Sequence, residues 1–511
     1  MNADRYHAWR QGADTRIHVN WSCLVADAFA AGPRGARLHA SRENAGVCTA
    51  PSRAGGRGPV PVSLRTCLHG RRHGVGHLSE LRRSAAVVER GGPWCEENAY
   101  TLGVQAVLWG YPMVCQARAG EASVRLGAAG VNAFRRDGTV GARGWLDLRD
   151  GPVVLHVPAL TEPRWYLVQI GDTFDEVAAN VGGIKGPRPG AHAITGPDFR
   201  GEVPGEMTRI RLRTGQGVAT ASVFVAGEVD LPGAVEALRG FRLLPLSAYL
   251  RDGLGHEPLD GQALPAFSDT APTELRFFEQ LGQTMSWYLP ISADRADPLV
   301  KAFHQIGLGV AHGFDWRSLD EDTAQGLARA AEAAEQIIDA HWAGVHTTTN
   351  GWRYHTAGGR TGHDLVLRAA LAKNMLGAQL AGEVISLRCD VDADDEPLHG
   401  DHAYQLHFPA GQAPPVSGWW SLATDRFGVG STSDGLTTNP DGSLTLYVQH
   451  DRPDDTAAAN WLPAPKTPFN LTMRFYGPGT RVLDGSYRLP RVIQRLGSHN
   501  RSYRTHVQTP L

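Results

Sequence analysis

Short runs of alternating polar and apolar residues fill the end of the chain, and they constrain its fold more than any other feature. The clearest runs are Ala403–Phe408, Ser443–Gln449 and Phe469–Tyr476. Strict alternation points successive side chains to opposite faces, as in a strand with one face buried. The turn sequence Asn439-Pro-Asp-Gly442 leads into the second run. We therefore predict an antiparallel β-sandwich domain over residues 401–511.

Residues 96–260 carry the signals of a mixed α/β domain. β-branched and aromatic residues gather in four stretches that we predict to be strands: 152–157, 164–170, 208–213 and 220–226. A helix is predicted to begin near Glu96 with Asn98 as its N-cap. It is expected to end or kink near Gly110-Tyr-Pro112, because proline removes a helical donor. A second helix is predicted over Leu231–Arg239.

Residues 261–400 are predicted to form a helical connecting segment. Apolar residues recur at helical spacing in Thr273–Tyr288, Leu319–Trp342 and His363–Ala378. Asp297 followed by Pro298 is typical of a helix start. The predicted fold class is therefore α+β, with a mixed α/β N-terminal domain, a helical middle segment and a C-terminal antiparallel β-sandwich.

Residues 1–95 differ from the rest of the chain in charge and show no helical or strand period. They are rich in arginine, whereas the formal net charge of the whole chain is -2. We interpret them either as a disordered basic extension or as the product of a start codon placed too early. An arm that binds nucleic acid is not favoured, because aromatic residues do not interleave with the arginines. We expect no nucleic-acid partner.

The cysteine spacing and the apolar runs indicate the redox state and the cellular location of the chain. The cysteines form no C-x-x-C pair, so we expect free thiols rather than a disulfide framework or a zinc site; they are Cys23, Cys48, Cys67, Cys95, Cys115 and Cys389. No apolar window is long enough for a membrane span, and no convincing signal peptide precedes the chain. We expect a soluble cytoplasmic protein. The edge strands of a sandwich allow homo-oligomerisation.

Several strings of residues carry a resemblance to a known family. In the second half they are Gly418-Trp-Trp-Ser-Leu422, Asp441–Gln449, Asn460-Trp-Leu-Pro-Ala-Pro465 and Val482-Leu-Asp-Gly485, together with Asn350-Gly-Trp-Arg-Tyr354 and His407-Phe-Pro-Ala-Gly411. In the first half they are Trp145-Leu-Asp-Leu148, Pro152–Pro158 and Trp165–Asp172. Over about residues 100–490 the chain resembles a bacterial family of paired domains of unknown function, numbered twelve-fifty-four (N-terminal) and twelve-fourteen (C-terminal). The resemblance implies a mixed N-terminal domain and a C-terminal β-sandwich, and it implies no established chemistry.

The chain departs from this family at two places. Family members carry an Asn-x-Asp-Thr-x-Tyr stretch before the Trp-Leu-Asp-Leu strand, whereas here Phe134–Trp145 runs almost directly into that strand. The segment after Trp420 is also short. If the missing stretch lines a pocket, this chain is expected to be an altered or inactive member.

Polar and aromatic residues at element ends are the candidate pocket groups. Asp172 follows an apolar strand, with Thr173, Asp175 and Asn180 nearby, which suits either a pocket or a turn that caps its own backbone. Trp352, Tyr354 and Asp364 complete the set of pocket candidates. Asp364 is also expected to form a surface pair with Arg368, four residues further along a helix.

Three tryptophans are candidates for an aromatic binding surface. Trp419, Trp420 and Trp461 could form a platform for a sugar or an apolar ligand, although large aromatic side chains also dominate ordinary cores. Exposure of these side chains would favour the platform, and burial would favour the core.

An acidic run and a nearby histidine cluster, which could bind zinc or iron, are the two candidates for a metal site. Asp390, Asp392, Asp394 and Asp401 partly reproduce the carboxylate rhythm of a calcium loop. Position six is Asp395 rather than the glycine that such a loop needs, so we interpret the run as a solvated acidic turn, with a divalent cation as the alternative. His399, His402 and His407 lie nearby, but His402 and His407 would point to opposite faces of one strand.

Common catalytic signatures are missing from the sequence. It contains no G-x-S-x-G elbow, H-E-x-x-H motif, P-loop or strand-linked G-x-G-x-x-G. We expect a small-molecule enzyme of unassigned class with a pocket between its two domains, since domain interfaces favour ligand clefts. The alternative is a non-catalytic protein that binds a ligand or another surface through the C-terminal sandwich.

Overall fold

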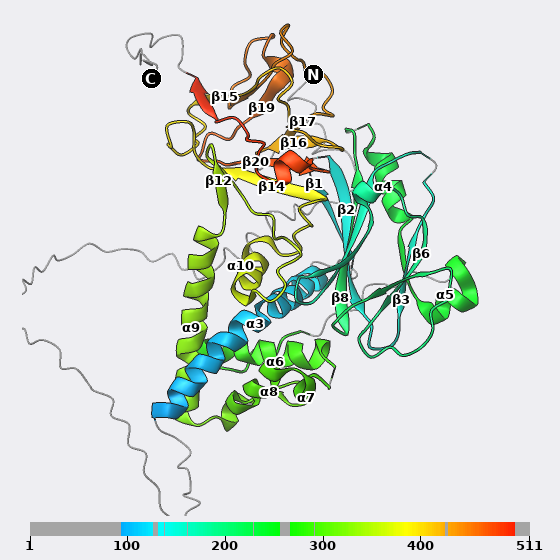
Figure 1. Cartoon of the computed structure of the whole chain (residues 1–511), viewed down its shortest axis with the longest axis vertical. Helices are drawn as coiled ribbons and strands as arrows, with labels where there is room; N and C mark the ends of the chain where they lie inside the picture. The colour runs from blue at the N-terminus through cyan, green and yellow to red at the C-terminus, as the bar shows by residue number, and fades with distance from the viewer. Residues whose placement is uncertain are drawn as a thin grey trace, which may run out of the picture. The chain divides into compact units, whose positions relative to one another are not determined.

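The computed structural model describes residues 93–125, 131–136, 138–160, 162–227, 229–255, 266–290, 292–424 and 428–495, which form an α+β fold (Figure 1). Residues 1–92, which make up nearly all of the predicted extension, lie outside the described residues. Cys23, Cys48 and Cys67 are among them. Helix α3 (Pro93–Arg125) already begins at Pro93, before the predicted start near Glu96. Proline suits a first helical turn, where its missing N–H is not needed.

Two sheets form the first β region, and their apolar faces share one core. A five-stranded sheet has the order β1-β2-β8-β4-β5, and a four-stranded sheet has the order β7-β6-β3-β9. Val168 and Val223 of the first sheet pack with Ile194 of the second in this core. The strands are β1 (Val131–Arg136), β2 (Thr139–Asp147), β3 (Val153–Val157), β4 (Tyr166–Asp172), β5 (Val177–Gly182), β6 (Gly190–Thr195), β7 (Thr208–Arg211), β8 (Gln216–Phe224) and β9 (Arg242–Pro245).

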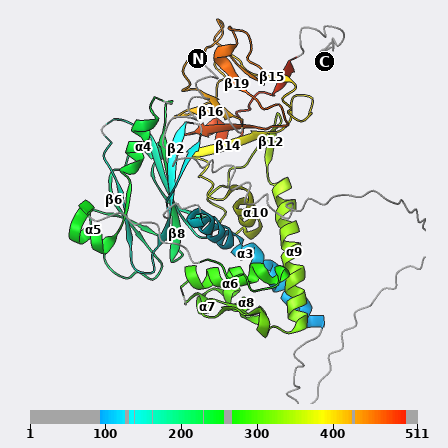
Figure 2. The same ribbon diagram turned by 180° about the vertical axis from the view of Figure 1, so that it is seen from behind.

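A layer of helices follows and packs around α3. Helix α9 (Glu321–Gly344) lies along α3, and both contact α10 (Leu365–Met375) (Figures 1 and 2). The predicted start at Asp297 is confirmed, because its side chain accepts a hydrogen bond from Leu299 N at the start of α8. The remaining α-helices of the described residues, inside and outside this layer, are α4 (Leu231–Arg239), α5 (Leu246–Asp252), α6 (Arg276–Tyr288), α7 (Ala293–Ala296), α8 (Pro298–Phe303) and α11 (Thr480–Leu483).

The sequence predicts that helix α3 ends or kinks near Pro112, and of these two outcomes the ending is wrong. The helix continues through Pro112 to Arg125. Residues 106–117 are buried on every side of the helix. The apolar surface that this stretch buries outweighs the one hydrogen bond that proline removes, so packing holds the helix together across the break.

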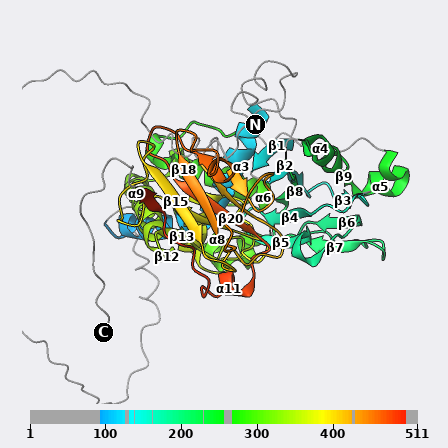
Figure 3. The same ribbon diagram turned by 90° about the horizontal axis from the view of Figure 1, so that it is seen from above.

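The C-terminal β region is a sandwich, as predicted. A six-stranded sheet has the order β12-β13-β14-β20-β16-β17, and a four-stranded sheet has the order β19-β18-β15-β21 (Figure 3). Side chains from both sheets, including Leu406 and Phe475, form one core. The strands are β12 (Thr347–Thr349), β13 (Trp352–Tyr354), β14 (Val384–Cys389), β15 (Ala403–Phe408), β16 (Trp420–Ala423), β17 (Gly428–Gly430), β18 (Leu444–Gln449), β19 (Trp461–Pro463), β20 (Leu471–Tyr476) and β21 (Ile493–Arg495).

The larger sheet of the sandwich begins earlier than the predicted boundary at residue 401. It takes β12, β13 and β14 from residues 347–389, which the sequence places in the helical segment. A small hairpin of β10 (Leu308–Gly309) and β11 (Gly313–Phe314) adds two short strands to the helical layer. None of the helices described is long and apolar enough to cross a membrane.

Candidate functional site

A row of polar side chains crosses the five-stranded sheet. Arg143 on β2, Thr220 on β8, Gln169 on β4 and Asn180 on β5 occupy directly paired positions on neighbouring strands. Paired residues share a face of the sheet, and the residues next to them along each strand point to the other face. Because neighbours such as Val168 lie in the apolar core, the polar row faces away from that core.

The polar row faces α3 and the residues that follow α10. Gln169 Nε2 donates a hydrogen bond to Ala378 O at 3.1 Å. Gly377 has a φ of 76°, and a side chain there would collide with the guanidinium group of Arg143. Glycine is therefore favoured at this position by its backbone conformation, and any larger residue would also require the guanidinium group of Arg143 to shift.

The turn after β4 places Asp175 beside the polar row. Asp172 Oδ1 accepts hydrogen bonds from Phe174 N at 2.9 Å and Glu176 N at 3.2 Å, and its Oδ2 accepts one from Arg213 Nε at 2.7 Å. These bonds close the turn. Asp175 then takes a left-handed backbone conformation, with a φ of 63°, which aspartate tolerates better than most residues.

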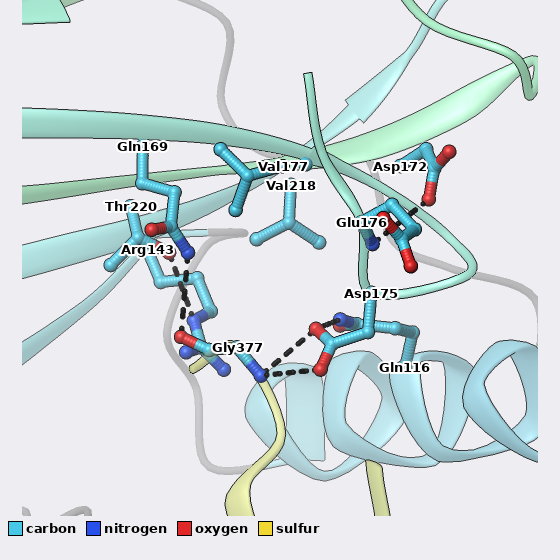
Figure 4. A pocket seen from close by; sticks show the side chains of 11 residues that line it. Gln116, Arg143, Gln169, Asp172, Asp175, Glu176, Val177, Val218, Thr220 and Gly377 are labelled. Carbon is cyan, nitrogen blue, oxygen red and sulfur yellow. Dashed lines mark hydrogen bonds between the residues drawn. The ribbon is translucent and has the colours of Figure 1, made fainter. Parts of the chain in front are cut away.

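Two donors hold the carboxyl group of Asp175 through three contacts, and the residue is half-buried (Figure 4). Gln116 Nε2 donates to Oδ1 at 3.0 Å, and Gly377 N lies 2.9 Å from Oδ1 and 3.1 Å from Oδ2. Desolvation raises the pKa of Asp175 to about 7, although the hydrogen bond from Gly377 and the charge of Arg143 act in the opposite direction. The group is thus poised to gain or lose a proton near neutral pH.

Arg143 supplies the positive charge at this place. Its side chain is buried, and its Nε donates to Thr220 Oγ1 at 3.2 Å. Desolvation lowers the pKa of the guanidinium group, whereas the nearby carboxyl group of Asp175 raises it. A guanidinium group keeps its proton in proteins, so Arg143 remains a fixed cation next to a titratable acid.

A small cavity opens among these side chains, and we call it the Asp175 cavity. It has room for about one water molecule, with a volume of about 20 Å³, and the wider hollow out to open solvent measures about 290 Å³. Its lining is Gln116, Arg143, Gln169, Gly171, Asp172, Asp175, Glu176, Val177, Val218, Thr220 and Gly377.

Several buried polar atoms at the cavity lack a hydrogen-bond partner among the described residues. They are Oε1 of Gln116 and Oε1 of Gln169 in the lining, and both amide atoms of Asn180 at the end of the polar row. Gln116 and Gln169 are 3% and 6% exposed, so bulk water does not satisfy them. A buried polar atom without a partner is costly, which makes these amides groups that a bound molecule would satisfy.

The predicted surface pair of Asp364 and Arg368 is not formed. Asp364 is exposed and caps α10, where its carboxylate accepts a hydrogen bond from Leu367 N at 2.9 Å. Arg368 is buried, with 5% of its surface exposed, and its guanidinium group lies over the ring of Phe174. The i, i+4 spacing predicted neighbours on a helix surface, but this face of α10 is covered by the turn that carries Asp175.

The other predicted pocket residues lie apart from the Asp175 cavity. Trp352 is fully buried in the sandwich core and donates through Nε1 to Pro490 O at 2.9 Å. Tyr354 is half-buried and packs against the same core. Of the five pocket candidates, Asp172 lines the cavity and Asn180 extends its polar row, whereas Trp352, Tyr354 and Asp364 serve other elements.

The three candidate platform tryptophans do not form an exposed surface. Trp419 and Trp420 are buried, and Trp461 is half-buried with its Nε1 donating to Gln449 O at 2.9 Å. Trp419 stacks on Tyr476 with ring centroids 4.0 Å apart. Their placement is that of core aromatic side chains.

The acidic run is held by protein partners. Asp390 pairs with Arg353 and Arg388, and Asp392 accepts hydrogen bonds from Asp394 N and Glu396 N. Asp394 and Asp401 are exposed. The nearby His399 is half-buried and accepts from Asp401 N, His402 is exposed, and His407 contacts Thr445 Oγ1. In the part of the chain that the structure describes, no three His, Cys, Asp or Glu side chains are placed to hold a metal ion.

A second cavity, with a volume of about 300 Å³ compared with about 20 Å³ for the Asp175 cavity, lies elsewhere on the chain. It is lined by Pro163, Arg164, Trp165, Tyr166, Gly183, Gly186 and Pro187. Arg164 is already paired with Asp230 through two hydrogen bonds of 2.6 Å each. The second cavity therefore offers rings and backbone, whereas the Asp175 cavity offers titratable and unsatisfied polar groups.

Sequence reasoning missed most of the Asp175 cavity. Gln116, Arg143, Gln169 and Gly377 come from distant parts of the chain and match no motif. The one available signal was the polar residues Arg143 and Gln169 inside strands that are otherwise apolar. That signal marks individual residues, and the register of four strands is needed to bring them into one row.

Comparison with known proteins confirms the resemblance. Residues 137–245 match the family model described as Protein of unknown function (DUF1254), and residues 383–480 match Protein of unknown function (DUF1214). The VPA0106 protein from Vibrio parahaemolyticus has a similar crystal structure, with 19% identity, 78% of this chain and 100% of that chain covered, and a TM-score of 0.61. An uncharacterized protein from Burkholderia cenocepacia has 12% identity, 78% and 94% coverage and a TM-score of 0.36. No curated protein matches this chain.

Proposed function

We propose that this chain, which carries a DUF1254 domain followed by a DUF1214 domain, is an enzyme that binds a small polar molecule at the Asp175 cavity and exchanges a proton with it through Asp175. The observation that carries the proposal is the group of buried, unsatisfied amide atoms around one titratable carboxyl group. In a purely structural network the buried polar groups form hydrogen bonds with one another, whereas a binding site leaves some donors and acceptors without a protein partner for its ligand.

Asp175 has the properties that acid–base chemistry needs. A pKa of about 7 lets the carboxyl group hold the proton in one step and release it in the next. Oδ1 receives two hydrogen bonds, from Gln116 and Gly377, while Oδ2 receives only the longer contact from Gly377. Oδ2 is therefore the oxygen that is better placed to carry the proton.

The neighbouring groups would orient the molecule. The unsatisfied Oε1 atoms of Gln116 and Gln169 accept hydrogen bonds, so they suit a ligand with N–H or O–H groups. Arg143 stabilises negative charge that develops close to Asp175. Because the cavity itself holds about one water molecule, only the polar end of a ligand would enter it, with the remainder in the wider hollow.

The cavity is not at the position that the sequence predicts for the pocket. Its lining comes from α3, the DUF1254 segment and Gly377, and no lining residue falls in the DUF1214 segment. The site we propose is thus between the first sheet and the helical layer.

The test compares the full-length wild-type protein with Asp175→Asn in a mixture of small metabolites followed by mass spectrometry. We expect the wild type to change the amount of at least one compound and Asp175→Asn to lose this activity. Asp198→Asn, which alters an exposed carboxylate, is the control and should behave as the wild type. Equal conversion by the wild type and Asp175→Asn would overturn the role of Asp175.

A further inference from the structure

Arg368 is a buried cation without a hydrogen-bonded partner. Its side chain makes no hydrogen bond or ion pair with the described residues, and its Nε is buried and unsatisfied. Its guanidinium group lies over the ring of Phe174, whose centroid is 4.9 Å from the guanidinium carbon. A buried guanidinium group is normally paired, because leaving its N–H groups unsatisfied is costly.

The carboxylates near Arg368 are already committed to other donors. Asp172 accepts from Arg213 Nε and from two backbone N–H groups. Glu176 Oε1 accepts from Thr361 N at 2.8 Å, from Gly362 N at 3.0 Å and from the Thr361 hydroxyl group. These carboxylates lower the electrostatic cost of burying Arg368, but neither makes a hydrogen bond to it.

Asp172 and Glu176 therefore leave the N–H groups of Arg368 without an acceptor. A guanidinium group binds an oxyanion most strongly when two of its N–H groups donate to two oxygens of that anion. The acceptor that suits Arg368 is thus an anion with two oxygens in one plane.

We propose that the ligand of this site is a small carboxylate and that the guanidinium group of Arg368 binds it. This inference rests on the proposed function, since it names the ligand class of the same site. The planar fork of a guanidinium group matches the two oxygens of a carboxylate. Arg368 and the Asp175 cavity are joined by the turn itself: Phe174 contacts Arg368, and the next residue lines the cavity.

Arg213 indicates the direction from which the anion arrives. Its side chain is 56% exposed, and it also lies over the ring of Phe174, with the guanidinium carbon 5.6 Å from the centroid. Both arginines therefore lie close to one ring, and Arg213 is exposed whereas Arg368 is buried. An exposed cation next to a buried one steers an anion towards the inner position.

The experiment measures binding of acetate, propionate and benzoate to the full-length protein by calorimetry and by the shift of the melting temperature. Each acid is compared with its amide, which has nearly the same shape and no charge. We expect carboxylates to bind and stabilise the wild type, and the amides to have no such effect. Arg368→Gln should weaken carboxylate binding roughly tenfold or more, and Arg368→Lys, which keeps the charge but loses the fork, should weaken it less. Arg317→Gln is the matched control, because Arg317 also lies over an aromatic ring, that of Trp316, but is exposed.

Three results would overturn the inference: no carboxylate effect on the wild type, equal effects of acids and amides, or wild-type binding by Arg368→Gln. The comparison within the wild type holds even if a variant folds poorly. If the conversion assay depends on Asp175 while carboxylates bind without Arg368, the proposed function stands and this inference fails. If carboxylates bind through Arg368 but Asp175→Asn converts metabolites as the wild type does, the inference stands and the proposed function fails.

Discussion

Asp175 combines three features that oppose stability at a single residue. Its backbone is left-handed, its carboxyl group is desolvated, and it lies close to Asp172, whose charge also raises its pKa. Each feature costs free energy unless the surroundings enforce it. The hydrogen bonds from Gln116 and Gly377 offset part of this cost. Retaining such a residue at a cavity is typical of a site selected for chemistry rather than for stability.

The raised pKa of Asp175 predicts how stability changes with pH. The folded pKa of about 7 lies above the ordinary value of 3.8, so the folded state binds the proton more tightly than the unfolded state does. This contribution is fully present below about pH 4 and is lost as pH rises through 7. It amounts to at most about 4 kcal/mol. Asparagine tolerates the same left-handed backbone, so Asp175→Asn should remove this contribution without straining the turn.

Urea unfolding of the wild type and Asp175→Asn between pH 4 and pH 8 measures the effect. The difference in the free energy of unfolding should shift in favour of Asp175→Asn as pH rises. Two curves that run parallel over this range would mean that Asp175 is ionised throughout and would contradict the raised pKa. Asp198→Asn serves again as the exposed control.

Individual residues show where sequence reasoning could and could not find the site. Asp172 and Asn180 were predicted because polar residues at the end of an apolar strand are a local pattern. Asp175 is in the same turn, but its importance depends on Gln116 and Gly377, which are distant in sequence. Arg368 was misplaced on the surface because helical spacing reports neighbours along one helix and not what covers that helix.

At the scale of elements, the close approach of α3 and α9 depends on glycines on both helices. A side chain at Gly326 would meet the backbone of Glu96 and Tyr100 and the Cβ of Ala99. On the other helix, a side chain at Gly103 would meet Ala330 and Leu327. The helices can therefore pack this tightly only because these positions lack a Cβ, and α3 in turn positions Gln116 at the cavity.

Gly326→Ala is predicted to destabilise the protein, even though alanine is the better helix former. The added Cβ would overlap the backbone of α3, which cannot move aside as a flexible side chain can. We expect a loss of about 1–3 kcal/mol in the free energy of unfolding, measured with urea. Gly344→Ala is the matched control, since it lies in the same helix with open space around it. It should be neutral or stabilising by up to about 1 kcal/mol. Equal effects of the two changes would show that α3 and α9 are not in close contact at Gly326.

Elements with a strong local pattern were predicted well from the sequence. Helix α4 has the predicted bounds, and β15 matches its alternating run. Local patterns failed where tertiary packing decided the outcome. Helix α3 continues through Pro112 because its surroundings bury it, and β12–β14 join the sandwich although they lie before its predicted start. Strands β12 and β13 have three residues each, which is too few to show a period of two.

At the scale of the whole molecule, aromatic side chains join the DUF1254 and DUF1214 segments. Trp165 and Phe224 of the first segment contact Trp419 of the second, with ring centroids 5.0 and 4.5 Å apart. Beside them, the buried carboxylate of Glu383 accepts a hydrogen bond from Ile184 N at 2.8 Å. These contacts link two cores that would otherwise be independent.

Because the junction is aromatic and largely buried, we predict that the two segments unfold in one cooperative transition. Trp165→Ala removes the ring that contacts both Trp419 and Tyr476. Loss of a large aromatic side chain costs about 3 kcal/mol, somewhat less here because Trp165 is half-buried. Since that cost falls on the junction, Trp165→Ala should separate the unfolding of the two segments, seen as two transitions by calorimetry and by circular dichroism in urea.

Trp287→Ala is the matched control, because Trp287 is also half-buried but packs against Phe267 in the helical layer. It should lower the melting temperature and keep a single transition. Two transitions in the wild type, or one in Trp165→Ala with only its midpoint lowered, would mean that the aromatic junction does not couple the two segments.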